Sequence, residues 1–164
     1  MIIVDPKDEP LYRPNVGIVL VNNQNSIFVG RRIGGEADAW QMPQGGINED
    51  ESEEVTLYRE VMEEIGLTKD QVKIIQKSQN ILYYQLPARS RRNFWHGKYI
   101  GQKQRWFLVK LECHDSKINI NTEFPEFCEW KWMSPSDVAR AAVSFKKDIY
   151  YSVLTEFNLI APQG

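Results

Sequence analysis

The alternation of apolar and polar stretches along the chain predicts a series of short strands. Residues 16–21 form an apolar, β-branched run and residues 26–31 form a second one after the polar segment 22–25, so the two are expected to pair as a hairpin. Further extended runs lie at residues 40–42, 72–75, 81–86, 106–111 and 127–133. Each run is shorter than a typical helix, which favours strands.

Three segments carry helix signals. Ser52 is suited to cap a helix that runs to about Ile65 and ends at Gly66, because Gly readily adopts the left-handed conformation of a helix end. A second helix is expected to start at Pro135, and a third covers residues 146–158. The order of elements predicts a single α/β/α sandwich domain over residues 1–164, with a mixed sheet covered by helices and an irregular lead-in at 1–11.

Length and composition bound the class of protein. The chain has 164 residues, of which 42% are hydrophobic and 26% charged, as is ordinary for one globular domain. The formal net charge of −2 excludes a protein that is basic over its whole surface, so contact with a polyanion needs a local patch. Two cysteines, no signal-peptide pattern and no apolar run of about 20 residues predict a cytoplasmic protein without a membrane span.

The helix predicted at 52–65 carries the candidate chemistry. A helical wheel places its glutamates on one side and its apolar residues on the other. The glutamates are Glu60, Glu63 and Glu64, and the apolar residues are Val55, Tyr58, Val61, Met62 and Ile65. Like charges within one turn destabilise a bare helix, and a hard cation such as Mg²⁺ would reverse that effect. Taken alone, the same face could be a solvated acidic surface.

The residues around this helix fit a longer pattern. Gly45 is followed after five residues by Glu51, and after seven more by Arg-Glu-Val-Met-Glu-Glu-Ile-Gly-Leu at residues 59–67. This run resembles the signature of Nudix hydrolases, Gly-x5-Glu-x7-Arg-Glu-U-x-Glu-Glu-x-Gly-U, in which U is aliphatic. A chance match to all of these positions has a frequency on the order of 10⁻⁷ per chain of this length. The resemblance implies hydrolysis of a pyrophosphate linkage with Mg²⁺, or Mn²⁺, as cofactor.

The residues of the signature have distinct expected roles. Gly45 and Gly46 would let the loop turn sharply and bring backbone close to the metal, with the Gly45 carbonyl as a ligand. The carboxylate ligands would be Glu60, Glu63 and Glu64. The resemblance implies that Arg59 orients the carboxylates through an ion pair, whereas Glu51 is expected to close the loop against the helix.

The implied reaction is the attack of water on a phosphorus atom. Mg²⁺ would neutralise charge on the phosphate oxygens, and one carboxylate would accept a proton from the water. That base is a glutamate of the metal cluster or Glu126. The sequence leaves the choice open, because carboxylates in one cluster titrate together.

Blocks outside the signature resemble one branch of the family, the bacterial RNA pyrophosphohydrolases, which are also described as (di)nucleoside polyphosphate hydrolases. The blocks are residues 12–17, 40–46, 101–107, 125–127, 130–132 and 144–148. The resemblance implies removal of pyrophosphate or phosphate from 5′-phosphorylated RNA ends, a step that exposes transcripts to decay.

The same resemblance assigns residues outside the signature. Glu126 would be a further metal ligand, and Arg13 and Arg32 would approach the 5′ phosphates. Phe145 and Lys146 would lie beside the first bases. Taken one by one, the charged residues could be ordinary surface groups and Phe145 a core residue.

The stretch from Arg89 to Arg105 is an independent clue to the substrate. It combines six basic residues with three aromatic ones and has no acid, which suits a single-stranded polyanion. The basic residues are Arg89, Arg91, Arg92, Lys98, Lys103 and Arg105, and the aromatic ones are Phe94, Trp95 and Tyr99. A solvated basic loop would have the same composition.

Three functions remain open at this point. An RNA 5′ pyrophosphohydrolase is favoured if a basic surface extends beyond the cleft, and a dinucleoside polyphosphate hydrolase if the pocket is closed with two base-stacking sites. A catalytically silent Nudix module that binds nucleotides or a protein partner is disfavoured, since no glutamate of the signature is missing. We expect a monomer, and the sequence identifies no protein activator.

Overall fold

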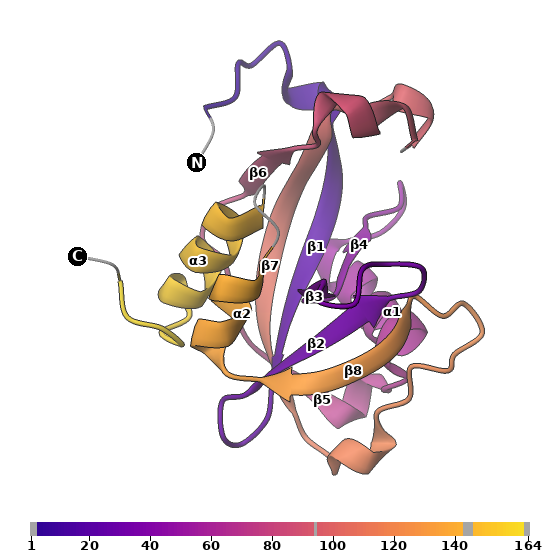
Figure 1. The fold of residues 1–164 in the computed structure, drawn as a ribbon, viewed down its shortest axis with the longest axis vertical. Helices are drawn as coiled ribbons and strands as arrows, with labels where there is room; N and C mark the ends of the chain where they lie inside the picture. The colour runs from indigo at the N-terminus through magenta and orange to yellow at the C-terminus, as the bar shows by residue number, and fades with distance from the viewer. Residues whose placement is uncertain (1–2, 94, 143–145, 163–164) are drawn as a thin grey trace.

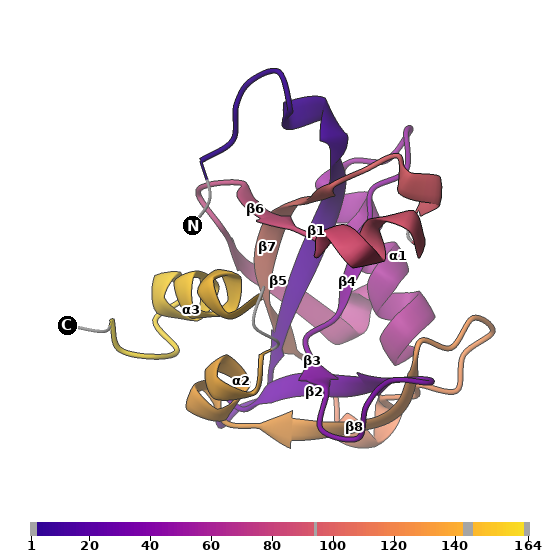
Figure 2. The same ribbon diagram turned by 45° about the horizontal axis from the view of Figure 1, so that its top comes forward.

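The computed structural model describes residues 3–93, 95–142 and 146–162, which form three layers (Figures 1 and 2). Helices α2 (Pro135–Ala141) and α3 (Lys147–Glu156) lie on one side of a sheet, and α1 (Glu53–Ile65) lies on the other. The predicted α/β/α sandwich is therefore confirmed. In the described ranges, no helix is both long enough and apolar enough to cross a membrane.

The sheet has eight strands and is mixed. They are β1 (Tyr12–Val21), β2 (Ile27–Arg32), β3 (Trp40–Gln41), β4 (Gln44–Gly46), β5 (Val72–Lys77), β6 (Leu82–Gln85), β7 (Gly101–Leu111) and β8 (Phe127–Met133). The main order is β3-β2-β1-β7-β5, and β4, β6 and β8 pair with β1, β7 and β2. The central pair, β1 and β7, is parallel over its whole length, whereas the other described pairings are antiparallel.

Apolar side chains alternate along β1 and supply two cores, one on each face of the sheet. Val19 and Val21 pack in the cluster that includes Val153 of α3. Ile18 and Leu20 belong to the opposite cluster, which holds the buried apolar residues of α1. Burying each such side chain stabilises the fold by about 1.5–3 kcal/mol, so both helical layers are held by apolar contact with the central strands.

Helix α1 begins and ends where the sequence predicts. The hydroxyl of Ser52 accepts a hydrogen bond from the Val55 amide at 3.1 Å, and Gly66 closes the helix with φ 73°. A Cβ at Gly66 would also lie 2.5 Å from the Asn119 carbonyl oxygen, so both the backbone angle and the space exclude a side chain there.

The buried face of α1 differs from the predicted one. Val55 and Met62, which were expected in the core, are 55% and 44% exposed. The core side is centred on Leu57 and Val61, and the glutamates of the first and last signature positions on the helix border it directly instead of lying opposite. The prediction was wrong here because it took every apolar residue of the helix as inward-facing.

Polar residues extend two strands beyond the apolar runs that predicted them. β1 begins at Tyr12 and β7 at Gly101, well before the predicted starts. Asn15 and Gln104 lie in these extensions and are buried, and the Gln104 amide donates to Asn15 Oδ1 at 2.8 Å. Mutual hydrogen bonding removes the cost of burying amides, so these positions need not be apolar.

Candidate active site

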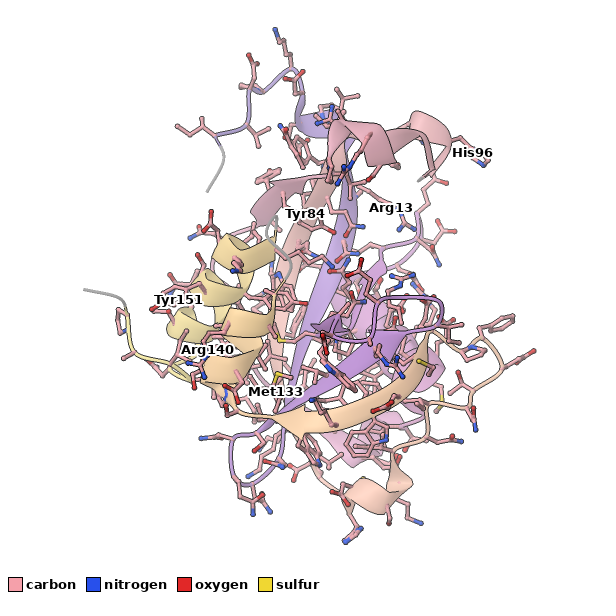
Figure 3. The ribbon with its side chains drawn as sticks, in the orientation of Figure 1. Arg13, Tyr84, His96, Met133, Arg140 and Tyr151 are labelled. Atoms are coloured by element: carbon pink, nitrogen blue, oxygen red, sulfur yellow. The ribbon has the colours of Figure 1, made fainter. Side chains whose placement is uncertain are left out.

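A cleft of about 550 Å³ gathers residues from β1, β2, β4, β6, β7 and α1. Its lining includes seven residues proposed from the sequence: Arg13, Arg32, Gly45, Glu60, Glu64, Glu126 and Lys146. Arg59 and Glu63 are not among the lining residues, and Phe145 lies outside the described residues. Arg13 of β1 and Tyr84 of β6 both line the cleft, and Figure 3 shows where their side chains leave these strands.

The guanidinium of Arg59 joins the loop before α1 to the glutamates of the helix. Nε donates to Glu51 Oε2 at 2.6 Å and Nη2 donates to Glu51 Oε1 at 2.8 Å. Nη2 also donates to the Gly46 carbonyl at 2.9 Å, and Nη1 donates to Glu60 Oε1 at 2.8 Å and Glu63 Oε2 at 3.1 Å. Hydrogen bonding to Arg59 holds the pKa of Glu51 at about 2, so Glu51 stays ionised and closes the loop on the helix as expected.

Glu60 and Glu64 are buried carboxylates, 8% and 5% exposed. Burial raises the pKa of Glu60 to about 7 against the opposing effect of Arg59. Burial and the nearby Glu60 raise the pKa of Glu64 well above its usual range. Among the described residues, Glu64 Oε2 finds no hydrogen-bond donor although it is buried. Such an oxygen costs about 1–3 kcal/mol or more when charged, and a cation at this point would remove the cost.

The carboxylates are not arranged as a finished metal site. In the described part of the chain, no group of three or more His, Cys, Asp or Glu side chains could hold an ion as it stands. Glu60 and Glu63 are turned to Arg59, and Glu126 pairs with Arg32 at 3.2 Å. Coordination of a metal by this set therefore requires some carboxylates to leave their arginine partners.

Three cations share the cleft with the acids. Arg13 packs on β4, since a Cβ at Gly46 would lie 2.2 Å from Arg13 Nη2. Lys146 is buried, with Nζ 3.3 Å from Gln44 Oε1 and 5.8 Å from the centre of the Tyr84 ring. Burial lowers the pKa of Lys146 to about 8. Together with Arg32, these groups give the cleft a cationic wall suited to phosphate oxygens.

Gly45 permits a close approach between backbone and carboxylate. A Cβ at this position would lie 2.0 Å from Glu60 Cδ and 2.2 Å from Glu60 Oε1. The sharp turn expected at Gly45 and Gly46 is absent: both lie in β4, paired with β1, and neither has a positive φ. The requirement for glycine here is therefore one of space.

A network of amides forms a further wall, to which the sequence analysis assigned no role. Gln44 is central to it: Nε2 donates to the Tyr84 hydroxyl at 3.2 Å and to Gln102 Oε1 at 3.4 Å. Gln104 Nε2 donates to Gln44 Oε1 at 3.0 Å. The sequence did contain a signal, because Gln102 and Gln104 alternate with the fully buried Trp106 and must face the same side of β7.

Comparison with proteins of known sequence gives a family and close relatives. Residues 11–153 match the NUDIX domain. The chain is 47% identical over 160 residues to an RNA pyrophosphohydrolase of Wolbachia pipientis wMel, covering 96% of this chain and 95% of that one. It is 48% identical over 153 residues to an RNA pyrophosphohydrolase of Photobacterium profundum, covering 92% and 86%.

Solved structures with the same fold point the same way. The E. coli dihydroneopterin triphosphate pyrophosphohydrolase aligns with TM-score 0.68 and 18% identity, covering 88% of this chain and 98% of that one. A C. elegans Ap4A hydrolase binary complex aligns with TM-score 0.65 and 19% identity, covering 90% and 99%. At this identity the likeness shows the fold alone, whereas the domain match and the sequence relatives show the family. The chain therefore belongs to the Nudix family and is a Nudix pyrophosphohydrolase.

Proposed function

We propose that this enzyme removes pyrophosphate, or phosphate stepwise, from triphosphorylated or diphosphorylated 5′ ends of RNA and so exposes transcripts to decay. The proposal is carried by the cleft, in which a wall of cations faces Glu60 and Glu64. Cations suit a chain of phosphates, and buried carboxylates suit a metal ion and the attacking water. Relatives at 47% and 48% identity that are named RNA pyrophosphohydrolase support RNA as the substrate.

Nudix hydrolases generally use divalent metal ions, and we propose Mg²⁺ here, with Mn²⁺ able to replace it. The partnerless oxygen of Glu64 fits such an ion. Glu60, Glu64, Glu126 and the Gly45 carbonyl would hold it from the cleft, with Glu63 once released from Arg59. When bound, the ion would neutralise charge on phosphate oxygens and lower the pKa of the attacking water.

The residues of the chain would divide the remaining work. Arg13, Arg32 and Lys146 would fix the polyphosphate through charge-assisted hydrogen bonds, so that the linkage to be cut is held in place. Glu64 or Glu126 would accept the proton that water loses during attack. Arg59 would act as a positioning residue that aims the glutamates, and Phe145 would lie with Lys146 beside the first bases.

A dinucleoside polyphosphate hydrolase is the second candidate, since the same cations and acids could act on a small substrate. The fold shared with an Ap4A hydrolase is compatible with it. The described lining does not favour it, because Tyr84 is the one aromatic side chain there and it is only 4% exposed. A silent Nudix module is disfavoured, since each glutamate of the signature is present.

We also propose that the enzyme acts as a monomer in the cytoplasm. The described lining of the cleft comes from one chain, so a second copy is not needed to complete it. Light scattering at the assay concentration should return the mass of a single chain, and a dimer that dissociates with loss of turnover would contradict this.

The experiment that tests the substrate compares kcat/KM for a 5′-triphosphorylated single-stranded RNA and for diadenosine tetraphosphate. Both are assayed in Mg²⁺, with parallel reactions in EDTA. A preference for RNA that disappears in EDTA supports the proposal. A preference for the dinucleotide would assign the enzyme to nucleotide clearance, and a folded protein inactive on both would return the silent module.

A further inference from the structure

The basic stretch from Arg89 to Arg105 divides into two groups with different surroundings. The carboxyl-terminal group lies in β7 and is neutralised by acids: Lys103 Nζ lies 2.6 Å from Glu9 Oε1, and Arg105 Nε lies 3.1 Å from Glu53 Oε2. Arg105 also donates to the Ser78 carbonyl at 2.7 Å. These two cations are therefore structural and are not available to a substrate.

The other group lies in the connection between β6 and β7, residues 86–100, which we call the β6–β7 loop. The loop contains the short 3₁₀ turns Ala88–Asn93 and Trp95–Gly97 and no acidic residue. Arg89 and Lys98 are exposed, and neither forms an ion pair within the described ranges. The loop therefore presents cations whose charge is not cancelled by the protein.

Hydrogen bonds fix this loop beside the mouth of the cleft. It begins at Leu86, which lines the cleft, and Arg91 Nε donates to the Leu86 carbonyl at 3.1 Å. Its two ends are joined by the Leu86 amide, which donates to the Ile100 carbonyl at 2.9 Å, and the Ile100 amide donates to the Leu11 carbonyl at 2.9 Å. Leu11 is two residues before Arg13 of the cleft, and Figure 3 shows Arg13 between Tyr84 and the turn that carries His96.

We propose that the β6–β7 loop is a second RNA contact, which binds phosphates of the nucleotides that follow the 5′ end held in the cleft. The inference rests on the proposed RNA substrate and extends it, because a dinucleoside polyphosphate has no chain to reach the loop. Uncancelled cations at the cleft mouth attract a single strand of phosphates without reading its sequence. The enzyme should therefore prefer longer single-stranded ends and lose that preference as salt rises.

The test uses the double variant Arg89→Gln/Lys98→Gln in the full chain. The matched control is Lys73→Gln/Lys77→Gln, which removes the same charge from exposed positions on β5, away from the cleft lining. The substrates are 5′-triphosphorylated single-stranded RNAs of two and about eight nucleotides with the same first bases. kcat/KM is measured for both at salt concentrations from about 50 to about 200 mM KCl, and circular dichroism verifies that each variant is folded.

The loop variant should lose several-fold in kcat/KM on the longer RNA and little on the dinucleotide, while the control matches the wild type. Each lost phosphate contact lowers the slope of log(kcat/KM) against log[KCl] by about 0.7, so two contacts account for roughly a sevenfold difference in salt response over this range. Equal behaviour of the loop variant and the control, with both RNAs cleaved, would overturn the inference alone. Failure of the wild type to cleave either RNA would overturn the proposed function itself.

Discussion

Replacement of Arg59 by Met should destabilise the protein, because this guanidinium serves three carboxylates at once. Arg59 is 27% exposed on its side chain and Glu51 14%, so the pair is largely shielded from water. Breaking a buried pair costs about 3–5 kcal/mol, and partial exposure reduces this to about 2–4 kcal/mol. For a chain of this size, that corresponds to a fall of roughly 5–15 °C in Tm.

The assay is urea unfolding followed by circular dichroism in EDTA, so that metal binding does not contribute. Arg140→Met is the matched control, since Arg140 also pairs with an acid, Asp137, but their side chains are 73% and 55% exposed. That exposed pair should contribute less than about 1 kcal/mol. If Arg59→Met and Arg140→Met changed the free energy of unfolding equally, the account of Arg59 as the organiser of the glutamates would be refuted.

Two further predictions concern the acids and the space around them. Gly45→Ala should lower turnover at least tenfold, because the new Cβ would displace the Glu60 carboxylate, whose Cδ it would approach to 2.0 Å; unchanged turnover would contradict this. In EDTA, the raised pKa of Glu60 means that the folded protein keeps a proton which the unfolded chain loses between pH 4.5 and about 7, so this group removes stability as pH rises through that window. Mg²⁺ binds the ionised form, so the Tm gain on adding Mg²⁺ should grow from about pH 5 to about pH 8, and a gain that does not change with pH would count against a metal at these carboxylates.

Local patterns predicted the elements of the fold but not all of their inward faces. The strand at 127–133 and the helix cap at Ser52 follow from short-range rules and are confirmed. Val55 and Met62 defeated the helical wheel, because which apolar residue faces inward depends on the sheet beneath the helix. Buried amides such as Gln104 were missed for a similar reason, since their partners come from distant strands.

The candidate site was accessible from sequence only through the spaced signature and the resemblance it carries. Neither predicts that Glu60 and Glu63 are turned to Arg59, or that Glu126 pairs with Arg32, because those contacts depend on side-chain geometry. The basic stretch was treated as one surface, and the structure separates it. Lys103 and Arg105 find acids that lie far from them in the sequence.

The most direct test of the central claim is the turnover of Glu64→Gln on 5′-triphosphorylated RNA in Mg²⁺. The amide keeps the size of the buried side chain but removes the charge that binds the cation and accepts a proton. We expect kcat to fall on the order of 10²–10⁴-fold, with the urea midpoint in EDTA retained or raised because a strained buried carboxyl is removed. Near-full turnover by a folded Glu64→Gln protein would contradict the claim that this glutamate and its cation perform the hydrolysis.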